Sequence, residues 1–590
     1  MKRYLKTGLP VAMLLLIVGV NFADAQMFGR RNSFVPDLTY LRFLIIAGSG
    51  AVGFGLGWLV SPEAARVRLV VGAIALGAAA LIAIAENGAI GWGLTPFVAL
   101  AAFMAGFGVW FARTAKRLLA KPTTFGDAQW ATIETIEEAG LLQNQIGIKL
   151  GFVNDAGIER PVVYSGDRHI WTSGPTRFGK GTDVIIPNLL TYEGSTLVID
   201  PKGENAMTTA KRREEMGQDV HILDPWHITA SAELEVSRYN PMDLLDPADI
   251  DFAEKSMMMG DSLTIPSGGD NKFWDESTKA VLQGMCGHVA SHPAYEGRRD
   301  LGTVRDLLML DAEELKKLAT EMLESPHHFI AAAGARLLQM DEKLLSNILA
   351  SAQAQTTMLD SPRLRESLSS SDFSFADMKT KPMTIYLVLP SDRLQTFSRW
   401  LRLLIQQAIK ENAQNIEVKP KQPILFILDE MPVLGHMSIV KEAFGLMAGY
   451  GMRLWAISQD ASQLKDIYGD SWESFISNAG VLQYFGSRDR MTSDYFSALC
   501  GETTIWNFST ALSRAVSTSS SSSGSSRSES ESETETASAV QRKLIYPDQL
   551  MRMKRDRQLL LIENLDPIIA RRTPWYRNLD LKDLGNNLHK

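Results

Sequence analysis

The residues best suited to chemistry lie in a short turn that ends at Lys180. Gly174, Gly179 and Lys180 have the G-x-x-x-x-G-K spacing of a loop that binds phosphate. Glycines let successive backbone N–H groups face one anion, and a helix predicted to begin near Lys180 directs its positive end at the same anion. The ammonium of Lys180 adds a full charge for the outer phosphates. The spacing therefore predicts a nucleotide-binding loop.

The loop departs from the usual pattern at one position. Gly181 follows Lys180, where a serine or threonine normally ligates Mg²⁺, and the nearest hydroxyl belongs to Thr182. Whether Thr182 reaches the metal is left open by the sequence, as is the alternative of a glycine-rich turn with a solvated lysine. The residues predicted to hold the nucleotide are Gly174, Pro175, Thr176, Arg177, Phe178, Gly179, Lys180, Gly181 and Thr182.

Two further apolar runs end in polar side chains. Asp429 and Glu430 follow the run 424–428, and Gln459 follows the run 453–458. An acid at the tip of a buried strand can hold Mg²⁺, and the next carboxylate can polarise the attacking water as a general base. A glutamine on the adjacent strand can contact the γ-phosphate. We therefore predict ATP and Mg²⁺ as cofactors, Asp429 and Thr182 as metal ligands, and Glu430 and Gln459 as catalytic residues. The alternative for Asp429 and Glu430 is an ordinary acidic turn at the end of a strand. The alternative for Gln459 is an amide that only hydrogen-bonds to backbone.

Ring-forming ATPases of this kind take an arginine from a neighbouring subunit. Arg453, Arg488 and Arg490 are candidates between which the sequence does not choose, and each could equally be a surface or structural arginine.

The elements that position these residues alternate between strand and helix. Apolar strands separated by helical segments predict a parallel α/β sheet that is buried on both faces. The periodicity is helical from 244 to 375, which predicts an all-α insertion before the sheet resumes at 383–389. Residues 517–538 are almost entirely serine, threonine and glutamate, and this predicts a disordered loop because few apolar side chains could repay the entropy of ordering.

The first 112 residues have a different character. Residues 1–25 combine basic residues with a short apolar run, which predicts a cleaved signal or a first transmembrane segment. Within a predicted transmembrane region 26–112, nearly uncharged segments indicate spans at about 43–60, 67–85 and 90–112. Lysines and arginines follow the last span, so the positive-inside rule predicts a multi-pass protein whose large C-terminal part is cytoplasmic.

Composition narrows the class of protein further. A chain of 590 residues implies several domains, and a net charge of −7 gives no support for a protein coated in nucleic acid. Its two cysteines, Cys286 and Cys500, are far apart, which excludes a disulfide framework and a zinc site of the usual spacing.

Taken together, these motifs resemble the type IV secretion coupling proteins, which are conjugative DNA-transfer ATPases. The resemblance covers nearly the whole chain. The segments that carry it are FGDAQWAT at 125–132, GPTRFGKGTDVIIPNLL at 174–190, VIDPKGE at 198–204, NKFWDES at 271–277, LDEMPVLG at 428–435, AISQDASQL at 456–464 and YPDQLMRM at 546–553.

The resemblance implies an α/β fold, namely a RecA-like P-loop NTPase core with an inserted all-α domain and an N-terminal helical transmembrane anchor. The core would comprise residues 113–243 and 376–590, with the insertion at 244–375. It further implies a multi-pass protein of the bacterial inner membrane that assembles as a hexamer. Its implied partners are the channel components, a relaxase–DNA complex or effector protein as cargo, and single-stranded DNA. Members of the family often have glycine after the loop lysine, and Gly181 occupies that position here.

Two alternatives share some of these features. A chromosome-type DNA translocase would have the same core but usually carries a DNA-reading C-terminal module, and none is evident after Leu561. A membrane receptor that docks substrates with weak or no hydrolysis is supported only by Gly181.

Overall fold

The computed structural model describes residues 38–60, 96, 99–100, 102–108, 124–143, 146–265, 272–414, 416–521 and 524–588. The chain divides into two units, which are described separately. The smaller comprises Met1–Thr124 with Thr504–Val540, and the larger comprises Phe125–Thr503 with Gln541–Lys590.

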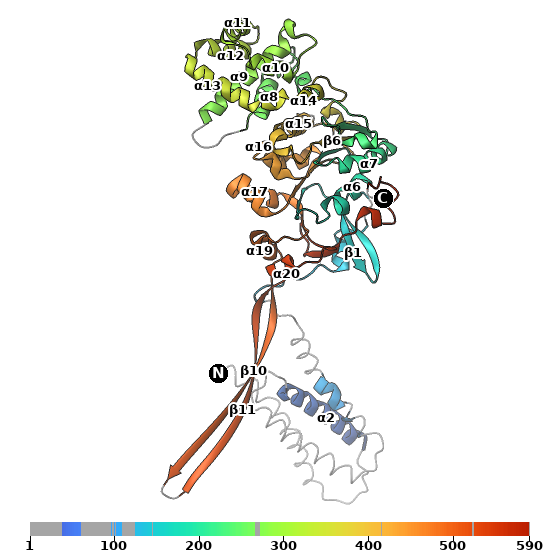
Figure 1. Cartoon of the computed structure of the whole chain (residues 1–590). Coiled ribbons are helices and arrows are strands. Elements are labelled where there is room, and N and C mark those ends of the chain that lie inside the picture. Colours follow the sequence, from blue (N-terminus) through green and yellow to red (C-terminus); the bar gives the residue numbers. More distant parts are fainter. Residues whose placement is uncertain are drawn as a thin grey trace, which may run out of the picture. The chain divides into compact units, whose positions relative to one another are not determined.

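An eleven-stranded sheet forms the centre of the larger unit (Figure 1). Its strand order is β2-β1-β13-β12-β9-β3-β8-β7-β4-β6-β5. From β9 to β5 every neighbouring pair is parallel, and from β2 to β9 every pair is antiparallel. The bounds are β1 Ile148–Asp155, β2 Ile158–Tyr164, β3 His169–Ser173, β4 Thr196–Asp200, β5 Asp219–Leu223, β6 Met383–Val388, β7 Ile424–Leu428, β8 Met452–Ser458, β9 Ala479–Tyr484, β12 Arg557–Ile562 and β13 Ile568–Arg571.

The central strands are buried along their whole length. Every residue of β3, β4, β6, β7 and β8 is buried. A parallel sheet is covered by helices on both faces, which is why these strands read as continuous apolar runs instead of alternating ones. The predicted α/β fold class is confirmed, but the sheet is mixed, because the predicted parallel arrangement is found only from β9 to β5.

Between β5 and β6 the described residues 224–265 and 272–382 form helices, turns and loops and contain no strand. The α-helices are α8 Phe252–Leu263, α9 Lys272–Ser291, α10 Leu301–Leu308, α11 Ala312–Leu323, α12 His328–Gln339, α13 Glu342–Gln355 and α14 Pro362–Ser367. In Figure 1 they gather at one end of the larger unit, and α15 (Leu394–Gln414) follows β6 between them and the sheet.

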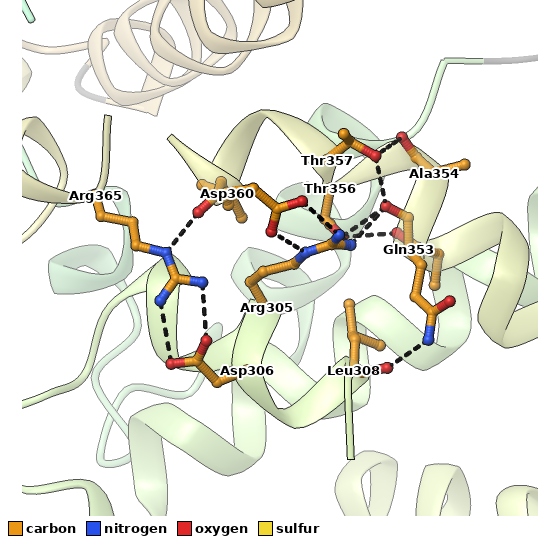
Figure 2. A network of polar contacts seen from close by, with 11 residues as sticks. Arg305, Asp306, Leu308, Gln353, Ala354, Thr356, Thr357, Asp360 and Arg365 are labelled. Carbon is orange, nitrogen blue, oxygen red and sulfur yellow. Dashed lines mark hydrogen bonds and ion pairs between the residues drawn. The ribbon is translucent and has the colours of Figure 1, made fainter. Parts of the chain in front are cut away.

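A buried arginine ties these helices together (Figure 2). Arg305 of α10 donates to both carboxylate oxygens of Asp360, at 2.9 and 2.8 Å, and to the carbonyl of Gln353 at 2.6 Å. Beside it, Arg365 of α14 donates to Asp306 at 3.2 and 2.8 Å. The network joins α10 to the end of α13 and to α14.

The prediction of a multi-pass membrane protein is wrong. Among the residues that the structure describes, no helix combines the length and apolar character needed to cross a membrane. The first predicted span, 43–60, falls in α2 (Leu38–Val60). The predicted segment 1–25, the span 67–85 and most of the span 90–112 lie outside the described residues.

Glycines in the smaller unit allow a close backbone approach. A Cβ placed on Gly53 would lie 2.2 Å from the carbonyl oxygen of Phe103, and one on Gly106 would lie 2.5 Å from the carbonyl oxygen of Gly50. Any side chain at these two positions would force the segments apart.

The serine- and glutamate-rich segment differs from its prediction. We predicted a disordered loop at 517–538, but its described residues lie in two paired strands, β10 (Glu502–Ser521) and β11 (Gly524–Lys543). Serine or threonine alternates with glutamate over 528–536, which is the period of a strand, and threonine favours strands. The alternation lacks an apolar side, so it gives no sign of a buried face.

Candidate functional site

Four neighbouring parallel strands bring the predicted site residues to one edge of the sheet. Their order is β3-β8-β7-β4, and their carboxyl ends lie at the same edge. Ser173 at the end of β3 is level with Ser458 at the end of β8, and Leu428 of β7 is level with Ala456 of β8. The phosphate loop, Gln459, the Asp429–Glu430 pair and the end of β4 at Asp200 therefore follow one another along this edge.

The loop after β3 has the tight turn that the glycines predict. Arg177 and Gly179 have left-handed backbones, with φ of 65° and 86°. A Cβ on Gly179 would lie 2.5 Å from a carboxylate oxygen of Asp183, and one on Gly174 would lie 2.8 Å from the Cβ of Phe485. Both glycines are therefore needed for the loop to close against its surroundings.

The helix after the loop starts irregularly. Residues Gly181–Ile185 form a π-helical turn, and α6 (Ile186–Leu189) continues from it. Pro187 lies in the first turn of α6 and has no N–H to donate to the carbonyl four residues earlier, which agrees with the irregular turn that precedes α6. Wide turns of this type occur frequently at functional sites.

The Lys180 ammonium lies between the loop and the acidic pair. Lys180 is 8% exposed, and its Nζ donates to the carbonyl of Gly174 at 2.9 Å. The same nitrogen is 3.7 Å from Oε1 of Glu430. The structure therefore places the phosphate-loop lysine and the acid after β7 in direct contact.

Glu430 also contacts the third predicted motif. Nε2 of Gln459 donates to Oε2 of Glu430 at 3.4 Å, and the backbone N–H of Gln459 donates to Gln463 at 3.0 Å. Lys180, Glu430 and Gln459, which come from three separate strand ends, thus form one chain of polar contacts.

Two carboxylates complete this edge, the buried Asp200 and the half-buried Asp429. Burial raises the pKa of Asp429 to about 6, although the charge of Lys180 opposes the rise and that of Glu430 adds to it. Burial also raises the pKa of Asp200 to about 7, where the charge of Asp429 adds to the rise. Two carboxylates that are desolvated and repel one another suit a divalent cation, because its charge offsets both the cost of desolvation and the repulsion. These residues therefore fit Mg²⁺.

Thr182 was predicted to bind Mg²⁺, whereas Asp200 was not. The Thr182 hydroxyl donates to Oδ1 of Asp183 at 2.7 Å, which commits its proton and leaves its lone pairs available to a metal. Asp200 ends an apolar strand just as Asp429 follows one, so the same signal was present, but no role was predicted for it.

Two residues near the loop carried no signal in the sequence. Arg572 lies 3.2 Å from the Asp183 carboxylate, and 389 positions separate the two along the chain. A contact between residues so distant in sequence has no spacing pattern by which it could be found.

The structure separates the three arginine candidates. Arg453 is 2% exposed, and its guanidinium lies 5.5 Å from the ring centre of Tyr164, so it is enclosed within its own subunit. Arg488 and Arg490 are exposed, and Arg490 pairs with Asp494 at 3.4 Å. Only the latter two could reach a neighbouring molecule.

Sequence comparisons agree on one family. The family model described as Type IV secretory system Conjugative DNA transfer matches residues 129–590. VirD4 of Rhizobium radiobacter is 27% identical over 468 residues, a match that covers 78% of this chain and 65% of that protein. TraG of Escherichia coli is 25% identical over 469 residues, covering 72% of this chain and 71% of that protein. The chain thus spans just under two thirds of the length of that VirD4.

Solved structures show the same fold. The unbound conjugative coupling protein TrwB superposes with a TM-score of 0.55 at 15% identity, covering 76% of this chain and 94% of TrwB. Plasmid coupling protein TrwB in complex with ADP and Mg²⁺ gives the same TM-score and identity over 77% of this chain and 95% of that one. At such low identity the likeness concerns the fold.

Proposed function

We propose, because the chain belongs to the type IV secretory system conjugative DNA transfer family, that it is an ATPase coupling substrates to a type IV secretion channel. The family predicted from the seven motif segments is thereby confirmed. The observation that carries the activity is the contact of Lys180 with Glu430 and of Glu430 with Gln459, at the sheet edge where Asp429 also lies. A relative in Bartonella quintana is named a type IV secretion system-coupling protein.

Each residue of the site has a role in this proposal. Backbone N–H groups from 176 to 182 and the Lys180 ammonium bind the phosphates of ATP. Asp429 and Thr182 would hold Mg²⁺, which neutralises charge on the phosphates when bound. Glu430 accepts a proton from the attacking water, and Gln459 orients that water or contacts the γ-phosphate.

The Lys180–Glu430 ion pair suggests how binding prepares the general base. Phosphate oxygens attract the Lys180 ammonium more strongly than one carboxylate does, because they carry more charge. Binding would therefore draw Lys180 from Glu430 and leave that carboxylate to Gln459 and water.

The assembly and partners follow from the family. We propose a homo-oligomer, with six subunits in a ring, that contacts channel components of a type IV secretion system. Its cargo would be a relaxase–DNA complex or an effector protein, and single-stranded DNA would stimulate turnover.

ATP turnover by the purified full-length chain tests the proposal. Lys180→Ala should abolish phosphate release with and without single-stranded DNA and weaken binding of a fluorescent nucleotide, because it removes the charge that faces the phosphates. Lys211→Ala, on an exposed face of α7 (Glu204–Glu215), is the matched control and should leave both unchanged. Unchanged turnover in Lys180→Ala would remove the proposed site, and nucleotide binding without any wild-type turnover would favour a docking receptor.

A further inference from the structure

A guanidinium from the C-terminal part of the chain lies against the phosphate loop. Arg572 directly follows β13, and its side chain is 0% exposed. Its Nε donates to the carbonyl of Arg557 at 3.2 Å, and its Nη2 donates to the carbonyl of Arg555. The guanidinium also lies 4.0 Å from the ring centre of Phe485. Three groups beyond the loop therefore hold this charge in one orientation.

The first loop contact sets the direction of a backbone amide. Nη1 of Arg572 donates to the carbonyl of Phe178. In a trans peptide the C=O and the following N–H point in opposite directions. The N–H of Gly179 therefore points away from Arg572. Gly179 immediately precedes Lys180, so this amide is among those expected to bind phosphate.

The second loop contact sets the direction of a hydroxyl. The same Nη1 lies 3.2 Å from Oδ2 of Asp183, whose other oxygen accepts the Thr182 proton at 2.7 Å. Because the Thr182 proton is directed at Asp183, the lone pairs of Thr182 face away from that carboxylate.

We propose that Arg572 is a positioning residue of the ATP site: it fixes the Phe178–Gly179 peptide and, through Asp183, directs the Thr182 hydroxyl towards Mg²⁺. The inference rests on the proposed function. It also accounts for Gly181, because the hydroxyl normally found at that position is supplied one residue later and held there by a remote arginine.

A purely structural ion pair makes a different prediction. Loss of such a pair would lower the melting temperature and leave the nucleotide and Mg²⁺ affinities of the folded protein unchanged. A positioning role alters those affinities even where the protein stays folded. Equilibrium binding of fluorescent ADP, measured over a series of Mg²⁺ concentrations alongside the melting temperature, therefore distinguishes the two.

Arg572→Lys in the full chain is the first test. Lysine keeps the charge, but its single ammonium cannot bond the Arg557 and Arg555 carbonyls, as Nε and Nη2 do, while also reaching the Phe178 carbonyl and Asp183, as Nη1 does. Partners of metal ligands typically contribute 10–100-fold to metal affinity, so we expect the Mg²⁺ concentration for half-maximal binding to rise by about that factor. Arg571→Lys is the control, because this neighbour is partly exposed and pairs with Glu159 away from the loop.

Asp183→Asn separates the two contacts and serves if Arg572→Lys fails to fold. It removes the charged acceptor of the Thr182 proton but leaves the Phe178 carbonyl to Arg572. We expect the Mg²⁺ requirement to rise while ADP affinity in EDTA stays within about twofold, since only a hydrogen bond to the metal ligand changes. An unchanged Mg²⁺ requirement in either folded variant overturns the inference. Wild-type turnover that Lys180→Ala abolishes would still stand, so the two proposals fail separately.

Discussion

Glu430 has a backbone conformation that residues other than glycine seldom adopt. Its φ is 55°, directly after Asp429 at the tip of β7. Strain of this kind costs on the order of 1–3 kcal/mol and concentrates at functional sites. Here the strained residue is also the one whose carboxylate contacts both Lys180 and Gln459, which agrees with its proposed role as general base.

Glu430→Gln should separate nucleotide binding from turnover. The amide cannot accept a proton from water, so kcat should fall by about 10²–10⁴-fold. Nucleotide affinity should be kept or increased, because Lys180 loses a competing carboxylate. Steady-state kinetics and fluorescent-nucleotide binding measure the two effects, with the exposed Glu442→Gln as the control. A variant that retains wild-type kcat would exclude Glu430 as the base.

Asp200 makes the free energy of unfolding depend on pH. Burial raises its pKa to about 7, whereas an aspartate in the unfolded chain titrates near 4. Between these values the folded protein binds a proton that the unfolded chain does not. The stability that this group contributes is therefore full below about pH 4 and is lost as the pH rises towards 7.

Replacing Asp200 by asparagine should remove that penalty. Asparagine keeps an acceptor for the Ala206 N–H, which donates to Asp200 at 2.9 Å, but it never ionises. Without nucleotide or Mg²⁺, the variant should be more stable than wild type at pH 8 by up to about 4 kcal/mol, with no gain at pH 4. Urea unfolding at the two pH values measures this, and the exposed Asp470→Asn should show no difference between them. An equal gain at both pH values would show that Asp200 is not protonated at neutral pH.

Residues at strand ends were predictable because each follows a buried apolar run. Lys180, Asp429 and Gln459 could be placed at one sheet edge by this reasoning, since parallel strands end together. Asp183 and Arg572 could not, because their positions depend on how the C-terminal strands return to the phosphate loop. Hydrophobic periodicity reports local secondary structure, and it does not predict which distant strands pair.

At the scale of elements, the sequence pattern correctly predicted the helices and strands that have a buried apolar face. It did not predict the paired strands β10 and β11. The helices from α8 to α14 keep an apolar stripe, and the central strands are wholly apolar, so both are visible in the sequence. Residues 528–536 of β11 alternate serine or threonine with glutamate. This stretch has no hydrophobic signature, and its composition alone suggested a disordered loop.

The Arg305 network makes a prediction at this same scale. Arg305→Met would leave Asp360 and the Gln353 carbonyl without their shared donor. The Asp360 side chain is 54% exposed and water can solvate it, so we expect a loss of about 1–3 kcal/mol, mainly from the Gln353 carbonyl. Chemical denaturation measures the loss, and the exposed Arg336→Met on α12 should stay within about 0.5 kcal/mol of wild type. A similar stability for both variants would show that the network contributes nothing.

At the scale of the whole molecule, the order of strands is the feature the sequence hides most completely. β13 pairs with β1 through Phe152 and Arg571, which lie at opposite ends of the larger unit's sequence. β12 extends the parallel sheet antiparallel to β9. These pairings bring the residue after β13 to the phosphate loop, so the last part of the chain completes a site whose first part lies some 400 residues earlier.

The proposed ring of subunits can be tested by mixing two inactive variants. The structure leaves Arg488 and Arg490 exposed, and an arginine supplied across an interface is worth about 10³–10⁵-fold in turnover. The double variant Arg488→Ala/Arg490→Ala keeps its phosphate loop, and Lys180→Ala keeps its arginines. Random mixing in equal amounts pairs an intact loop with an intact arginine at about one quarter of interfaces, so ATP turnover should reappear at about that fraction of the wild-type rate. Turnover that never exceeds the sum of the separate variants would mean that neither arginine acts across the interface, because no combination of subunits then completes a site.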